Sequence, residues 1–306
     1  MKLTKPMLKA FFSIVHGDNT VTKVAHALCK SIKWTDMIIN LLEDEGFIIK
    51  KRNYTLQGSR LLIEVASTSY AQKMRELLFE SSGIPLEKVL TEGRLLFLAA
   101  LSEDWTSIPI AVELSKLSKY SIERYRPALL KRGIIKRRKD LYTLNERTWL
   151  LLKDFVINYK NYSTIEGVTH WKYNQETIFE VQNEKNIQGS ITGLNAYEQH
   201  GIQVGVISSL CIIPKRKLTK EEIFVHSLFE INDPRTLHLA IAFYLKNKLA
   251  YKKVMPLAMK YGKYTMFEDF VKLLNIKEDK VKLESLPTFD RKDFKRIADM
   301  YGVKDV

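Results

Sequence analysis

The residue types that most often carry catalysis are present in this sequence, but they lack the spacing that catalysis needs. Cys29 follows His26 by three residues, and a Cys–His pair can supply a nucleophile and its base. Both residues lie on a stretch with helical apolar spacing, where a structural cysteine is the better interpretation. His200 and His226 are the best candidate ligands among six scattered histidines, none of which has H-E-x-x-H spacing. G-x-S-x-G, Walker A and G-x-G-x-x-G motifs are also absent, so we predict no enzyme, no metal and no cofactor.

Two short basic runs give the clearest chemical signal in the sequence. One is Lys50-Lys51-Arg52, and the other is Lys136-Arg137-Arg138-Lys139. Basic side chains at a hairpin tip can lie along DNA phosphates or enter the minor groove. The alternative is that both runs are solvated hairpin tips. Two runs at equivalent places of a repeat favour contact with nucleic acid, and purely protein contact stays open as the other function of such a repeat.

Both basic runs belong to one pattern that occurs twice. Gly46 and Gly133 stand 133 − 46 = 87 positions apart, and the offset holds without a gap back to Val21 and Ile108. Each copy predicts a helix with apolar residues at helical spacing, then a Gly just past its end and a strand. A basic turn and a Tyr-Thr-Leu return strand follow.

In the first copy the expected elements continue beyond the hairpin. Lys50 to Asn53 is the expected tip, and Tyr54-Thr55-Leu56 is the expected return strand. A long helix is expected from Gln57 to Phe79, with apolar residues at helical spacing along it. Residues 81–85 have the composition of a linker.

Helix, Gly, strand, basic tip and strand is the pattern of a winged helix-turn-helix, and about the first 160 residues resemble tandem winged-helix domains. The resemblance implies an α+β chain with a winged-helix domain over residues 1–80, which ends in the long helix. It implies a second winged-helix domain over residues 86–163 and leaves a smaller α+β domain over residues 170–306.

The resemblance assigns base reading to the third helix of each copy and phosphate contact to the wing. The expected DNA-binding residues are Lys33, Thr35, Asn40, Lys50, Lys51 and Arg52 in the first copy, and Ser121, Arg124, Arg137, Arg138 and Lys139 in the second. Pro127 falls inside the third helix of the second copy, which would therefore begin late, near Arg124, or bend. For that reason we expect Asn40→Ala to relax specificity more than Arg124→Ala.

From about residue 170 the pattern of the sequence changes. Strands are expected over residues 177–181, 204–213 and 223–229, with a short helix closed by Gly201 between the first two. Helices are expected over residues 234–246, 251–261, 266–274 and 290–300.

Residues 192–201 and 233–262 resemble the nucleotidyltransferase-like domain of abortive-infection type E antitoxins. Active nucleotidyltransferases of this kind carry Gly-Ser followed by Asp-x-Asp, which binds the metal. Gly189-Ser190 is present, but the next acidic residue is Glu198, which stands alone. Without two carboxylates the site cannot hold a magnesium–triphosphate group. We therefore expect this domain to act by contact, with a second copy or with a toxin-like protein.

Charge and composition are in keeping with a nucleic-acid partner. The 306 residues carry a net charge of +14. Residues 1–160 hold 27 Lys and Arg against 17 Asp and Glu (+10), and the remainder holds 22 against 18 (+4), so positive charge concentrates in the duplicated half. Two cysteines without C-x-x-C spacing fit a reducing cytoplasm. We expect no membrane-spanning segment and no secretory signal.

The sequence favours a DNA-binding transcriptional regulator, and the resemblance implies an antitoxin-like autorepressor. A plasmid replication initiator, or a polymerase-associated tandem winged-helix factor, is the second interpretation. A protein–protein or RNA-associated scaffold is the third. An autorepressor would bind an operator beside its own gene, an initiator would bind repeated sites at an origin, and a scaffold would bind neither.

Overall fold

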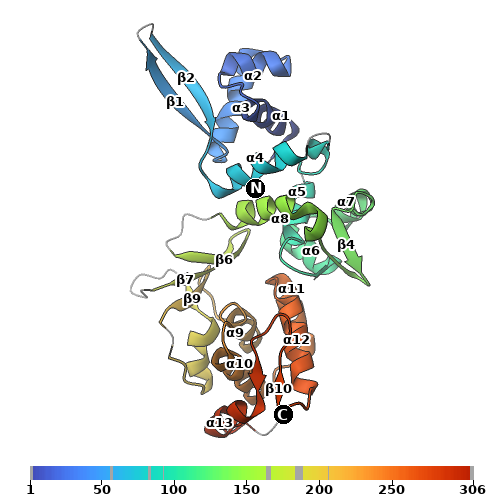
Figure 1. Ribbon diagram of the computed structural model, residues 1–306, viewed down its shortest axis with the longest axis vertical. Helices are drawn as coiled ribbons and strands as arrows, with labels where there is room; N and C mark the ends of the chain where they lie inside the picture. The colour runs from blue at the N-terminus through green and yellow to red at the C-terminus, as the bar shows by residue number, and fades with distance from the viewer. Residues whose placement is uncertain are drawn as a thin grey trace. The chain divides into compact units, whose positions relative to one another are not determined.

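The computed structural model describes residues 3–55, 58–81, 84–91, 93–162, 167–182, 189–205 and 207–303. Helices and strands occur together along these residues, which agrees with the expected mixed α and β class (Figure 1). The chain forms two compact units. The first comprises Met1–Ser102 and Ala111–Tyr162, and the second comprises Glu103–Ile110 and Ser163–Val306.

The first unit contains the same order of elements twice, three helices followed by a hairpin and a fourth helix. The first repeat consists of α1 (Lys5–Val15), α2 (Val21–Leu28), α3 (Ile32–Asp44), β1 (Ile48–Thr55), β2 (Gly58–Val65) and α4 (Ser69–Glu80). The second repeat consists of α5 (Gly93–Ala100), α6 (Ile108–Ser115), α7 (Lys119–Lys131), β4 (Ile135–Arg138), β5 (Leu141–Leu144) and α8 (Glu146–Asn161). Two short elements, η1 (Leu86–Lys88) and β3 (Thr106–Ser107), lie in the connections.

The 87-residue offset holds at the level of single residues. Helices α3 and α7 each have 13 residues and begin 119 − 32 = 87 positions apart. Each is capped by a serine, Ser31 or Ser118, whose side chain accepts a hydrogen bond from a backbone N–H three residues on. Cys29 and Lys116, which follow α2 and α6, are also 87 apart and both have a left-handed φ, of 52° and 56°. The predicted duplication is therefore confirmed.

The hairpin of the first repeat is longer than the sequence suggested. Lys50 to Asn53 lie within β1, so the prediction that they form the tip is wrong; residues 56–57 lie outside the described residues. The predicted helix from residue 57 is also wrong over β2, and α4 begins only at Ser69. Long-range contacts of Ile63 favour a strand over a helix here. Its N–H donates to Asn19 O (2.9 Å), and the residue pairs with Lys50 across the hairpin. Figure 1 shows this hairpin reaching well beyond the helices of its repeat.

The two repeats share one core where α4 packs on α8 (Figure 1). Phe47, Tyr70, Phe155 and Tyr159 form an aromatic cluster, which we call the junction cluster. Ring centroids are 5.1 Å apart for Tyr70–Tyr159 and 5.2 Å apart for Phe47–Tyr159. Such pairs contribute about 0.5–1.5 kcal/mol each beyond burial. Tyr70 Oη donates to Glu45 O (2.7 Å), and Tyr159 Oη hydrogen-bonds the Glu45 carboxylate.

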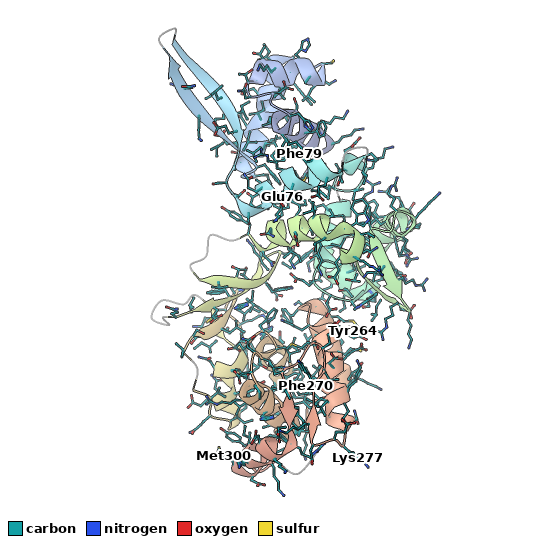
Figure 2. All side chains as sticks on the ribbon, in the orientation of Figure 1. Glu76, Phe79, Tyr264, Phe270, Lys277 and Met300 are labelled. Carbon is teal, nitrogen blue, oxygen red and sulfur yellow. The ribbon has the colours of Figure 1, made fainter. Side chains whose placement is uncertain are left out.

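The second unit is built on a four-stranded antiparallel sheet with helices packed on it. The strand order is β6 (Val168–Tyr173), β7 (Glu176–Val181), β9 (Ser209–Ile213) and β8 (Ser190–Ile191). The helices are η3 (Gly193–His200), α9 (Lys220–Ser227), α10 (Pro234–Lys246), α11 (Tyr251–Lys260), α12 (Tyr264–Asn275) and α13 (Arg291–Tyr301). A small pair, β10 (Lys280–Val281) and β11 (Phe289–Asp290), completes it. Rings of Phe224, Tyr244, Phe267 and Phe270 pack among the helices. Phe270 is labelled in Figure 2.

Most elements predicted for this unit are present, but one predicted strand is a helix. The four predicted helices are confirmed as α10 to α13, and the short helix closed by Gly201 is confirmed as η3. The strand predicted over residues 223–229 is wrong, because Lys220–Ser227 is helix α9. Thr219 and Glu222 form a reciprocal capping box that starts this helix. Residues 222–227 are all buried, including polar Glu222, His226 and Ser227, so polarity does not separate an inner face from an outer one here.

Among the described residues, the apolar helices are all too short or too polar to cross a membrane.

Gly46 and Gly133 provide a matched pair for testing the junction cluster. Both have a left-handed φ, of +72° and +64°, but a Cβ on Gly46 would lie 2.2 Å from Tyr70 Oη, whereas a Cβ on Gly133 would meet nothing within 4 Å. We expect Gly133→Ala to lower the free energy of unfolding by about 1–2 kcal/mol, the cost of a left-handed alanine. Gly46→Ala should lower it by about 2–3 kcal/mol more, because Tyr70 loses its hydrogen bond to Glu45. Urea unfolding of the full chain measures both, and equal losses would contradict this account of the junction.

Candidate nucleic-acid interface

Helix α7 presents a basic outward face. Its buried side holds Ile122, Tyr125 and Leu129, so the opposite side faces outward, and there Tyr120 is 76% exposed and Arg124 is exposed as well. The segment from Lys119 through the C-cap Arg132 holds five basic residues and one acid, a net charge of +4.

Pro127 does not shorten α7. The helix is continuous from Lys119 to Lys131, so the prediction that it begins near Arg124 is wrong. Pro127 is exposed, so Glu123 O, which loses its helical partner, lies on the outer side of the helix. Ser121, predicted to read bases, lies in the first turn, where its N–H donates to Ser118 Oγ (3.1 Å) and its Oγ is 3.0 Å from that atom. Its hydroxyl is therefore already engaged in the cap.

The β4–β5 hairpin places its basic residues beside α7. Lys139 and Asp140 form a two-residue loop, in which Lys139 has a left-handed φ of 53°. Arg137 Nε donates to Lys139 O (2.6 Å), which holds its side chain at the tip. Tyr142 lies under two guanidinium groups: that of Arg137 is 5.8 Å from its ring centroid, and that of Arg126, from α7, is 5.5 Å away. The wing and the helix therefore share one positively charged surface, to which exposed Arg138 and Lys139 also belong.

The corresponding face of α3 has the opposite charge. From Ile32 through the C-cap Glu45 the segment holds one Lys and four acids, a net charge of −3. Lys33 is exposed as predicted. Thr35 is fully buried and its Oγ1 donates to Ser31 O (3.0 Å), so its prediction as an exposed base-reading residue is wrong. Thr35 shares the inner side of α3 with Ile38, Ile39 and Leu42, whereas Leu41 is exposed.

The remaining site residues of the first repeat are largely engaged with neighbouring side chains. Asn40 donates to Asp36 (3.4 Å) and accepts a hydrogen bond from Lys50. Lys50 also pairs with Glu43 (3.1 Å), and its side chain is only 15% exposed. Lys51 pairs with Glu64 (2.6 Å), whereas Arg52 is exposed. Lys50 therefore anchors the hairpin to α3. Lys33, Lys51 and Arg52 are exposed at the predicted positions, and Lys51 is paired with Glu64.

Sequence reasoning missed three residues of the α7 surface. Tyr120, Lys131 and Arg132 stand at the positions that match Lys33, Asp44 and Glu45 in the first repeat. Carrying the 87-residue offset through the whole third helix would have exposed this reversal of charge. The predicted hairpin residues do not show this reversal, because they are basic in both copies.

Comparison with models of protein families, with characterised proteins and with solved structures finds no match to this chain. The winged-helix and antitoxin-like resemblances therefore depend on the residues quoted for them and stay predictions.

Gly189-Ser190, the remnant of a nucleotidyltransferase motif in the predicted resemblance, has a structural partner. Ser190 Oγ donates to Arg216 O (2.5 Å) and accepts from Arg216 N (2.8 Å). No three His, Cys, Asp or Glu residues of the described chain come together in a way that could hold a metal ion. Cys29 and His26, considered above as a nucleophilic pair, are both exposed, and Cys29 follows the end of α2.

Two buried titratable groups of the second unit have displaced pKa values. Burial lowers the pKa of His226 to about 3, and the charges of Arg216 and Lys260 add to the fall. Its Nδ1 lies 2.7 Å from Thr192 Oγ1. Burial raises the pKa of Glu230 to about 8, although the hydrogen bond from the Leu194 N–H opposes the rise. A Cβ on Gly193 would lie 1.9 Å from Glu230 Oε2, so a glycine is required there.

Glu230 should make stability fall as pH rises. Its carboxyl ionises near pH 4.5 in the unfolded chain but only near pH 8 in the folded chain, so the folded state binds more protons between these values. Gln cannot ionise and keeps an oxygen for the Leu194 N–H. We therefore expect Glu230→Gln to match the wild type near pH 5 and to exceed its melting temperature increasingly toward pH 8.

Glu222→Gln is the control for this experiment. Burial alone would raise the pKa of Glu222, but hydrogen bonds from Thr219 and Arg216 outweigh it and lower the pKa. This substitution should therefore lower stability near neutral pH, where Glu222 is ionised and paired with Arg216 (2.6 Å). Scanning calorimetry at several pH values measures both variants. A Glu230→Gln difference that stays constant with pH would contradict the buried, protonated carboxyl.

Proposed function

We propose that this protein is a transcriptional regulator that binds double-stranded DNA, and that its second repeat makes the main DNA contact. The observation that carries the proposal is the single basic surface formed by α7 and the β4–β5 hairpin. A helix with a net charge of +4 can enter the major groove, while Arg138 and Lys139 on the hairpin reach the adjoining phosphates.

Arg124 and Tyr120 are the groups that would contact bases. Arg124 lies at the middle of the outward face of α7, and arginine pairs with guanine through two hydrogen bonds. Its guanidinium donates to Tyr125 Oη (3.2 Å), which limits the directions in which it can point. Tyr120 stands one turn earlier and is exposed enough to contact a thymine methyl or the sugar backbone.

The first repeat has a lesser part in this proposal. Phosphates would meet a net negative α3, and two of the three wing cations already neutralise Glu43 and Glu64. Exposed Lys33 and Arg52 would add outer phosphate contacts. This arrangement supports one principal DNA contact per chain rather than two equal ones.

The resemblance to antitoxins suggests what the protein does besides binding DNA. The second unit would serve as a partner or effector domain, and the chain would repress its own gene. Mobility shift on the DNA upstream of its own gene, against a random duplex of the same length, tests this role. Equal affinity for both duplexes would contradict a regulator of its own gene and would leave sequence-independent binding.

Two matched triple substitutions test which repeat binds. Replacing Arg137, Arg138 and Lys139 by Ala should flatten the log–log salt dependence of binding by about 2–3, at about 0.9 for each lost phosphate contact. Replacing Lys50, Lys51 and Arg52 should flatten it by about 1 or less, because Lys50 and Lys51 are already paired with acids. Fluorescence anisotropy across a salt series measures both slopes. A larger effect in the first wing would contradict the assignment.

Base reading is tested separately by two single substitutions. Arg124→Ala should reduce discrimination between the preferred duplex and single-base variants by about 1–3 kcal/mol at one position. Asn40→Ala should change it little, because Asn40 hydrogen-bonds Lys50 and Asp36 on an acidic face. This order reverses the one expected from the sequence, which depended on α7 being disrupted at Pro127.

A further inference from the structure

The outward face of α3 has the composition of a protein interface. Met37 is 51% exposed and Leu41 is 42% exposed, one turn apart on the same side of the helix. Asp44 is exposed one turn further along, and half-buried Asp36 lies one turn before Asn40. Interfaces typically combine an apolar centre, in which Met is enriched, with a polar rim. Acids beside this apolar pair exclude a phosphate backbone as its occupant.

The face of α7 is its electrostatic complement at matched positions. Arg124 stands where the first repeat has Met37, and Lys131 stands where it has Asp44. Tyr120 lies on the same face, and its aromatic side chain is 76% exposed. At the matched positions the α3 face offers Met37 and Asp44 and the α7 face offers Arg124 and Lys131, so the two faces differ in charge, and each includes an apolar or aromatic group.

Both faces lie on the outside of the same compact unit. They can therefore meet face to face only when they belong to two different chains. A second copy carries both, so the α3 face of one chain can meet the α7 face of the other, and the reverse. In a closed two-fold dimer, residue i of one chain contacts residue j of the other, and residue j of the first contacts residue i of the second. Complementary charge would orient the encounter and suppress pairing of like faces, α7 with α7.

We infer that the α3 face is a docking surface for the α7 face of a second copy of this chain, in a reciprocal dimer. The contact uses groups on the exposed sides of α3 and α7, because both helices bury their opposite sides. It does not depend on DNA binding, although the proposed DNA contact would use the same α7 face. Duplex DNA is therefore left out of the test.

Exchanging the matched residues tests this inference. Met37→Arg with Asp44→Lys gives the first repeat the residues of the second at these two positions, so that the matched positions are basic on both faces. Arg124→Met with Lys131→Asp does the opposite, so that the matched positions are apolar and acidic on both faces. Lys252→Asp, an exposed position on α11, is the control for altered net charge.

Light scattering is measured at low salt and at protein concentrations up to about 100 µM, so that a weak interface can form. The wild type and the Lys252→Asp variant should then have about twice the chain mass of 35.6 kDa. Each exchange variant alone should stay at the monomer mass, and an equimolar mixture of the two should regain the dimer. Circular dichroism checks that both variants are folded. A monomeric wild type, exchange variants that still dimerise, or a mixture that stays monomeric would overturn the inference. Duplex binding by the Met37→Arg, Asp44→Lys variant is measured separately, so failure of the DNA proposal is distinguishable.

Discussion

The corner formed by Glu45 and Gly46 is the constraint on which the first unit depends. Glu45 is the C-cap of α3, and its carbonyl accepts the hydrogen bond of Tyr70 from α4. Its carboxylate accepts a hydrogen bond from Tyr159 of α8. Tyr70 reaches this corner because Gly46 has no Cβ. The end of the third helix, the start of the hairpin and the packing of the two repeats are therefore fixed by the same few atoms.

The repeat was readable from the sequence because its signals are local. Apolar residues at helical spacing, a glycine after each third helix and a basic run recur at one offset, and each acts within a few residues of the chain. The long-range features were not readable. Residues 58–65 contain apolar spacings that fit a helix or a strand, and only pairing with β1 decides between them. Helix α9 is buried on all sides, so its Ile-Phe-Val run looks like a strand until its Thr219–Glu222 cap is considered.

The candidate interface was predicted only in part, for a similar reason. The basic runs and the third helices could be located, and Lys33, Arg52, Arg124, Arg137, Arg138 and Lys139 are exposed where expected. The partners of Lys50 and Lys51 could not be foreseen, because Glu43 and Glu64 approach them only once the hairpin is formed. One backbone thus carries two different surfaces. Leu42 and Leu129 lie at matched inner positions of α3 and α7, whereas outer Asp44 in the first repeat corresponds to Lys131 in the second.

Segment 103–110 has a consequence for how the chain is made. It interrupts the second repeat and belongs to the second unit, where Asp104 accepts hydrogen bonds from the backbone and side chain of Thr265 at the start of α12. These partners are 161 residues apart in the sequence. At a synthesis rate of about 5–20 residues per second, Asp104 leaves the ribosome about 8–30 s before Thr265 does. The second unit therefore cannot form this contact until residue 265 has been translated, whereas the first repeat has its complete sequence much earlier.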